Sequence, residues 1–265
     1  MKNKQIVFSD IDGTLLTSTL EISPDTVAAI RALAQRGVPF VIVSARGPMA
    51  IAPLLAKYDI VCPEICYSGA LLRDEHGKVL YHKPLGKATA KAVIDYLRTL
   101  PYDTSTCVYS PDQWISPDRN DPRVQSEERI VEAQSVQGTV DDITDDVSKL
   151  LVVTSKADLD GVEAAVKQAF PYCTVVRSGS FLLEVMAGGV NKAEGVKLYC
   201  QLTGASSADC IAFGDHYNDV EMLRAVGRGY LMGNAPKELL AALPLHTDDN
   251  NHDGIPHALR KEGIV

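Results

Sequence analysis

Three short apolar runs, each followed at once by polar residues, most strongly constrain the fold of this 265-residue chain. They cover residues 6–8, 38–43 and 210–213, and such runs are typical of strands buried on both faces of a sheet. A helix beginning at Pro24, with Ser23 as its cap, is predicted between the first two runs. Alternation of strands and helices with short connections predicts an α/β fold with a doubly wound parallel sheet.

The alternation is interrupted near Pro84 and resumes near residue 188. In between, predicted strands cluster without regular alternation, and a Pro- and Asp-rich stretch at residues 102–120 is expected to be irregular. The sequence therefore predicts one Rossmann-like core domain, formed by residues 1–83 and 188–265, and an inserted α+β cap domain at residues 84–187.

Charge and composition exclude several classes of protein. The formal net charge of −8 and the pI of about 5.3 argue against nucleic acid or an anionic membrane as the main partner. No apolar run approaches the roughly 20 residues of a membrane span, and the run after residues 1–4 is too short for a signal peptide. The six cysteines form no Cys-x-x-Cys pair, which indicates free thiols. A cytoplasmic protein is expected.

Asp10 and Asp12 follow the first apolar run with one residue between them. Side chains at i and i+2 leave the same face of an extended chain, so both carboxylates are expected to point into one site. Two acids this close repel each other, so either a divalent cation compensates them or one stays protonated. An Asp-x-Asp pair alone is more often just a polar turn, and its meaning depends on the rest of the chain.

Polar groups also follow the other predicted core strands. Ser44 comes after the second run, whereas Asp215, Asn218 and Asp219 come after the third. Ligands of open parallel sheets bind at the carboxyl ends of the strands, so these groups are expected to converge there, with Lys192 at the start of the preceding helix. Carboxylates for a cation, together with donors for phosphoryl oxygens, are what phosphoryl transfer needs.

At this point the chain resembles the haloacid dehalogenase superfamily. The four motifs that carry the resemblance stand in order in the chain, as Asp10-Ile-Asp-Gly-Thr14, Ser44-Ala-Arg46, Lys192 and Gly214-Asp-x-x-Asn218-Asp219. Residues 47–191 separate the second motif from the third, which resembles the type IIB, Cof-type branch with its cap domain at this place. Two positions depart from that branch, which usually has Gly at Ala45 and Asn at Ser68.

The resemblance implies a role for each motif residue. Asp10 would be the nucleophile, and Asp12 the general acid and base. Mg²⁺ would be held by the carboxylates of Asp10 and Asp215 and the backbone carbonyl of Asp12, with Asp219 in its second coordination shell. Four further groups would hold phosphoryl oxygens, namely Ser44, the Ala45 amide, Lys192 and Asn218. Arg46 would contact the substrate or the cap.

We therefore expect a Mg²⁺-dependent phosphatase that hydrolyses small phosphorylated metabolites, chiefly sugar phosphates, through a phospho-aspartyl intermediate. A cap would close over the site and exclude macromolecules, which favours a small substrate. The negative charge argues against nucleic acid or a membrane as partner, and no obligate protein partner is implied. Two alternatives remain open. A hexose phosphomutase would use the same aspartates but isomerise its substrate. A phospho-accepting signalling module that resembles a receiver domain would release no inorganic phosphate. Such a module would need neither an acid at Asp12, two residues after the nucleophile, nor a large insert.

Overall fold

The computed structural model describes residues 5–179 and 181–265. Residues 1–4 and Ser180 lie outside the described residues, and the expectation of no signal peptide rests partly on residues 1–4. The chain divides into two compact units. The first contains residues 1–44, 55–80 and 191–265, and the second contains residues 45–54 and 81–190. This division lies three residues from the predicted domain boundaries at 83 and 188, and it groups residues 45–54 with the insert.

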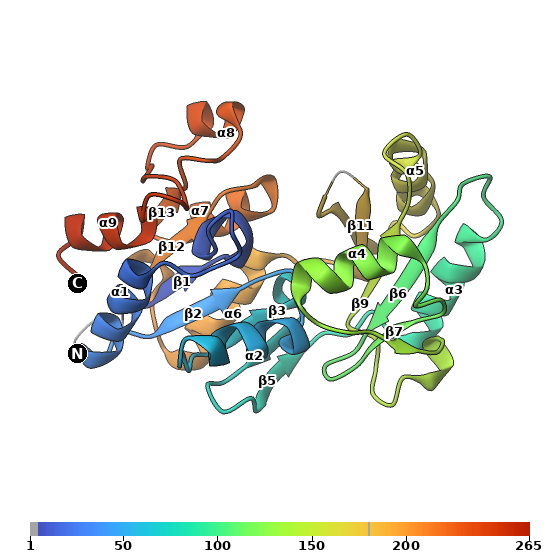
Figure 1. The fold of residues 1–265 in the computed structure, drawn as a ribbon, viewed down its shortest axis with the longest axis horizontal. Coiled ribbons are helices and arrows are strands. Elements are labelled where there is room, and N and C mark those ends of the chain that lie inside the picture. Colours follow the sequence, from blue (N-terminus) through green and yellow to red (C-terminus); the bar gives the residue numbers. More distant parts are fainter. Residues whose placement is uncertain (1–4, 180) are drawn as a thin grey trace. The chain divides into compact units, whose positions relative to one another are not determined.

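A seven-stranded sheet has the order β13-β12-β1-β2-β3-β4-β5 (Figure 1). It belongs to the first unit except for the last two residues of the edge strand β5, which fall in the second. The pairs from β13 to β3 are parallel, whereas β3 and β4 are antiparallel. Strands β1, β2 and β12 are buried along their whole length, so both faces of the sheet are covered, as the doubly wound prediction requires. The strands are β1 (Val7–Ser9), β2 (Phe40–Val43), β3 (Glu64–Cys66), β4 (Leu71–Arg73), β5 (Val79–His82), β12 (Ile211–Gly214) and β13 (Arg228–Leu231).

Helices cover this sheet, and α6 packs against β2, β3 and β4 while α1 packs against β2 and α9. Helix α1 begins as predicted, because the Ser23 hydroxyl accepts a hydrogen bond from the Thr26 N–H at 3.1 Å. The helices here are α1 (Pro24–Gln35), α2 (Pro48–Lys57), α6 (Lys192–Thr203), α7 (Val220–Ala225), α8 (Lys237–Ala242) and α9 (Gly254–Lys261), of which α2 crosses the division between the units.

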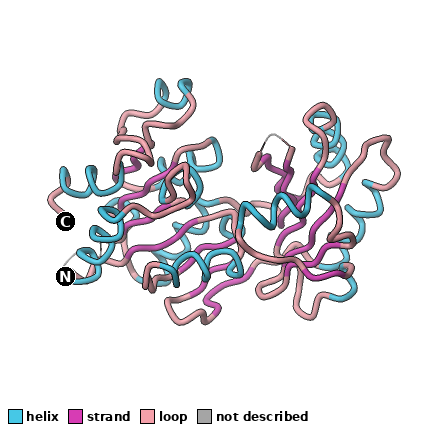
Figure 2. The backbone as a smooth tube through the Cα atoms, in the orientation of Figure 1, coloured by secondary structure: helices cyan, strands magenta, loops and turns pink. Residues whose placement is uncertain are grey.

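The second unit contains a six-stranded sheet with the order β10-β11-β9-β6-β7-β8, drawn in magenta with its helices in cyan in Figure 2. One apolar cluster joins side chains of the sheet to those of α3 and α5, which confirms the α+β prediction. Its strands are β6 (Ser105–Tyr109), β7 (Trp114–Ser116), β8 (Val136–Gln137), β9 (Lys149–Val153), β10 (Cys173–Arg177) and β11 (Leu182–Ala187). Its helices are α3 (Lys87–Leu97), α4 (Pro122–Val131) and α5 (Leu159–Ala169).

The prediction that residues 102–120 are irregular is wrong, because β6 and β7 lie within them. The two strands pair antiparallel, and the rings of Tyr109 and Trp114 stack at 5.2 Å between centroids. Both aromatic side chains are buried. Pairing with β9 and this aromatic contact stabilise a segment whose local composition favours turns, so tertiary packing overrides the local pattern.

Side chains alternate between the two faces of the insert sheet. Leu150 and Leu183 belong to the apolar cluster with the helices, whereas their neighbours Lys149 and Glu184 point to the other face. There the Lys149 ammonium pairs with the Glu184 carboxylate at 2.9 Å, and both residues are buried. Across residues 5–179 and 181–265, no helix is both long and apolar enough to span a membrane.

Candidate active site

The carboxyl ends of β1 and β12 place two of the predicted acids side by side. These strands are parallel neighbours, and the Asp10 N–H donates to the Phe213 carbonyl at 3.0 Å. Asp215 directly follows β12, and Asp219 lies in the short turn before α7. From β1 the chain proceeds to β2 on one side of the sheet, whereas β12 and β13 lie on the other. The acids therefore occupy the point where strand order reverses, the usual ligand site of such sheets.

Lys192 lies between two of these acids at the start of α6. Its ammonium nitrogen is 2.7 Å from Asp10 Oδ1 and 2.6 Å from Asp219 Oδ1. All three side chains are buried, and Lys192 is only 2% exposed. Burial disfavours a charged lysine, but the two carboxylates outweigh it and raise the pKa of Lys192. The ammonium ion is therefore a fixed positive charge beside the predicted nucleophile.

Asp219 uses both of its carboxylate oxygens inside the protein. Oδ1 accepts from Lys192, while Oδ2 accepts from the backbone N–H groups of Asp215 and His216, each at 3.0 Å. The Asp219 side chain also lies against Gly214, where an added Cβ would be 2.4 Å from Asp219 Cβ. Asp219 thus shapes the loop that carries Asp215.

A tight turn over residues 11–15 brings Gly13 against Asp215. The Leu16 N–H closes the turn by donating to the Ile11 carbonyl at 2.9 Å, and Gly13 has φ +77°. A Cβ at Gly13 would lie 2.3 Å from Asp215 Oδ2, so only glycine allows this approach. The neighbouring Thr14 hydroxyl donates to Asp215 Oδ1 at 3.0 Å, which fixes one carboxylate oxygen.

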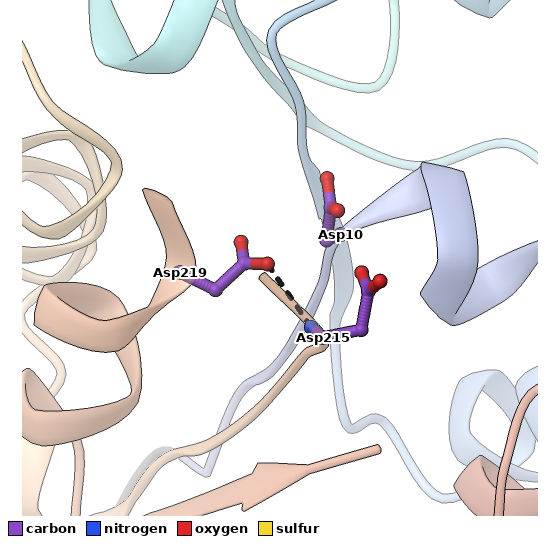
Figure 3. A group of neighbouring side chains, drawn as sticks. All are labelled: Asp10, Asp215 and Asp219. Atoms are coloured by element: carbon purple, nitrogen blue, oxygen red, sulfur yellow. Dashed lines mark hydrogen bonds between the residues drawn. The ribbon is translucent and has the colours of Figure 1, made fainter. Parts of the chain in front are cut away.

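The carboxylates of Asp10, Asp215 and Asp219 converge, as Figure 3 shows, with one oxygen of each within 4.8 Å of the others. Burial raises the pKa of Asp10, although Lys192 opposes it. Burial and the charge of Asp219 raise the pKa of Asp215 to about 7. One ammonium ion cannot neutralise three carboxylates. This excess negative charge and the converging carboxylate oxygens of Asp10, Asp215 and Asp219 fit a hard divalent cation.

Asp12 lies in the same turn but is exposed. It is close enough that its charge contributes, after burial and other acids, to the raised pKa values of Asp10 and Asp215. The Asp12 carboxylate is not one of the three that converge. Asp10 and Asp12 therefore differ in burial, since Asp10 is buried and Asp12 is exposed. An exposed carboxylate beside a buried one is suited to exchanging protons with substrate and water.

Ser44 follows β2, the strand beside β1, and is buried. Its carbonyl accepts from the Ser68 N–H at 2.9 Å. Ser68 has φ +55°, a left-handed conformation that asparagine tolerates better than most residues. Asn218 is half-buried in the turn between Asp215 and Asp219. These positions place both Ser44 and Asn218 at the predicted edge of the sheet.

Ala45 and Arg46 fall with the second unit in the division of the chain. Arg46 is buried there, and the Ala45 carbonyl accepts a hydrogen bond from Lys149 at 2.8 Å. Their expected contacts to phosphate and to substrate therefore stay predictions.

Asn234 also lies at the site, although the sequence motifs do not include it. Its amide nitrogen donates to the Gly13 carbonyl at 2.9 Å and lies 3.4 Å from Asp215 Oδ2. A sequence signal for Asn234 does exist, because it follows the parallel strand β13. Polar residues that follow parallel strands lie at the carboxyl edge of the sheet, where ligands bind.

Comparisons with known proteins agree with this geometry. The family model of haloacid dehalogenase-like hydrolases matches residues 7–259. A Haemophilus influenzae protein described as a "Putative phosphatase" is 30% identical, with 97% of each chain covered. An HMP-PP phosphatase of Cronobacter sakazakii is 30% identical over 89% of this chain and 86% of its own.

Among solved structures, a haloacid dehalogenase-like hydrolase from Bacteroides thetaiotaomicron has a TM-score of 0.88. It is 26% identical, and the match covers 97% of this chain and 99% of that one. The family match spans both units and all four sequence motifs. The chain belongs to the haloacid dehalogenase-like hydrolase family.

Proposed function

We propose that this protein is a Mg²⁺-dependent phosphatase that hydrolyses small phosphorylated metabolites, chiefly sugar phosphates. The observation that carries the proposal is the buried Lys192 ammonium ion between Asp10 and Asp219. Burial raises the pKa of Asp10, and the Lys192 charge opposes that rise, so the contact supports a carboxylate nucleophile at this position. The phosphatases among the relatives support the same reaction class.

In the proposed reaction, an oxygen of Asp10 attacks phosphorus and the bond from phosphorus to the leaving oxygen breaks. Asp12 gives its proton to that oxygen, so an alcohol leaves and an acyl phosphate remains on Asp10. Asp12 then takes a proton from water, which attacks the same phosphorus, releases inorganic phosphate and restores Asp10.

The other residues bind and orient the phosphoryl group. Mg²⁺, held by the carboxylates of Asp10 and Asp215 and the backbone carbonyl of Asp12, would neutralise phosphoryl charge. An ammonium group has three N–H donors, and two of those of Lys192 serve Asp10 and Asp219, so the third would donate to a phosphoryl oxygen. We assign further phosphoryl contacts to Ser44, the Ala45 N–H and Asn218, a substrate contact to Arg46, and substrate selection to the insert at residues 84–187.

The test is phosphate release by the full-length protein from a panel of sugar phosphates and from p-nitrophenyl phosphate. We expect release that requires Mg²⁺ and stops when EDTA removes it. The remaining sugar phosphate should be chemically unchanged; an isomerised product would indicate the phosphomutase instead. Absence of phosphate release from every compound, with Mg²⁺ present, would contradict the enzyme proposal.

Replacing Asp12 with asparagine should separate the two chemical steps. Asp12→Asn removes the acid and base, a loss of about 10²–10⁴-fold in rate. Since p-nitrophenolate leaves without a proton, the variant should still release one equivalent of p-nitrophenol rapidly and then turn over slowly. Rapid-quench measurements of the burst and steady state would check this. Steady-state rates within tenfold of wild type would refute the role of Asp12.

Gly13→Ala should impair turnover through Asp215. The new Cβ would displace the Asp215 carboxylate, and a misplacement of about 1 Å can cost on the order of 10²-fold in rate. Gly37→Ala is the matched control, because Gly37 also has positive φ, at +69°, yet an added Cβ there meets nothing within 4 Å. Both variants should lose stability in thermal unfolding, but only Gly13→Ala should lose turnover. Equal losses of turnover would show that backbone strain, not Asp215, is responsible.

A further inference from the structure

Asn234 links the turn that carries Asp12 to the carboxylate of Asp215. Its amide nitrogen donates to the Gly13 carbonyl at 2.9 Å and lies 3.4 Å from Asp215 Oδ2. The opposite oxygen, Oδ1, accepts from Thr14. The two oxygens of Asp215 are therefore approached by donors from two different elements, which restricts rotation of the carboxylate.

The orientation of the Asn234 amide is itself held by the segment before α9. The backbone N–H of Asn250 donates to Asn234 Oδ1 at 3.2 Å, so the amide nitrogen is directed toward Gly13 and Asp215. The Asn250 side chain donates to the Leu16 carbonyl at 2.7 Å, at the other end of the same turn. Residues more than 200 positions apart in sequence are thus joined at this site.

We propose that Asn234 is a positioning residue that orients Asp215 and the Gly13 turn for binding a divalent cation, with the Asn250 backbone fixing the direction of its amide. The inference rests on the metal site of the proposed function. Asn234 is exposed and follows the strand β13, so its loss removes little packing. Its effect should appear in cation affinity more than in folding. Loss of a partner that orients a metal-binding carboxylate typically weakens metal affinity about 10–100-fold.

The test measures Mg²⁺ binding to the full-length protein by isothermal titration calorimetry, without substrate. Asn234→Ala should raise the Kd for Mg²⁺ about 10–100-fold, while thermal unfolding without Mg²⁺ stays close to wild type. Asn120→Ala is the matched control, because Asn120 is an exposed asparagine of the insert whose backbone N–H bonds to Asp118. Its Kd should equal that of wild type.

The possible outcomes distinguish this inference from the proposed function. If wild type binds Mg²⁺ and releases phosphate but Asn234→Ala binds Mg²⁺ equally well, the inference is wrong and the phosphatase proposal stands. A lower unfolding temperature with unchanged Mg²⁺ affinity would show a purely structural role and would also overturn it. If wild type itself neither binds Mg²⁺ nor releases phosphate, both proposals fail.

Discussion

Asp10→Asn should abolish phosphate release while leaving the protein folded. An amide cannot attack phosphorus as a carboxylate does, and removing the nucleophile of a cooperating group removes most of its acceleration, so we expect a loss of about 10³-fold or more. Asparagine has nearly the same shape as aspartate. Because burial raises the pKa of Asp10, a neutral group at this position also avoids the cost of desolvating a charge.

The measurements are steady-state phosphate release and acid-quenched labelling with a phosphorylated substrate. Wild type should carry a labelled acyl phosphate at Asp10, and the variant should carry none. Asp25→Asn is the control, because Asp25 on α1 is a half-buried acid that pairs with Arg260 on α9 at 2.7 Å. That variant should keep full activity. Turnover of Asp10→Asn within tenfold of wild type would show that another group attacks phosphorus.

Lys192→Met should destabilise the protein more than any of the other substitutions. Methionine fills a similar volume but leaves the buried carboxylates of Asp10 and Asp219 without their shared ammonium ion. Breaking a buried ion pair by removing one partner costs about 3–5 kcal/mol. Turnover should also be lost, because the proposed donor to the phosphoryl group is removed.

The loss of stability should depend on pH. Lys192 lowers the pKa of Asp10 against the effect of burial, so in Lys192→Met the folded-state pKa rises further above the unfolded value of about 3.9. A raised folded-state pKa means that the folded state binds more protons. The destabilisation relative to wild type is therefore largest above the folded-state pKa of Asp10 in the variant, and its pH-dependent part disappears below the folded-state pKa of Asp10 in wild type.

Urea unfolding at pH 5 and pH 8 would measure this difference. Lys197→Met is the matched control on the same helix, because Lys197 pairs with Glu194 at 2.8 Å in an exposed position. Exposed pairs contribute only about 0.2–1 kcal/mol, so the control should change little at either pH. If the two variants differ by less than about 1 kcal/mol at pH 8, the Lys192 bridge does not stabilise the fold as inferred.

Local patterns were sufficient to predict the architecture of the core. Apolar runs correspond to β1, β2 and β12, and Ser23 and Pro24 begin α1 where the capping pattern indicates. The same patterns failed at β6 and β7, because those strands depend on pairing with β9 and on the stacking of Tyr109 with Trp114. A short strand with few local signals is decided by its neighbours.

The candidate site divides in the same way. Asp10 and Asp215 could be predicted because the carboxyl ends of parallel strands share one edge of a sheet. Lys192 alone would more often be an exposed residue at a helix start, and only its distances to Asp10 and Asp219 show a buried bridge. The sequence indicated a site role for Asn234 even more weakly, since its hydrogen-bond partner Gly13 lies 221 positions away.

By itself, the sequence determined the buried core strands β1, β2 and β12, the start of α1 and the polar residues that follow those strands, because apolar runs and helix caps act over a few neighbouring residues. The tertiary structure alone decided which of those residues touch. Gly13 lies so close to Asp215 that no Cβ would fit between them, and this approach depends on the parallel pairing of β1 with β12. Lys192 lies between two acids because α6 packs at this edge of the sheet. Such contacts join distant parts of the chain, and only the packed fold sets their distances.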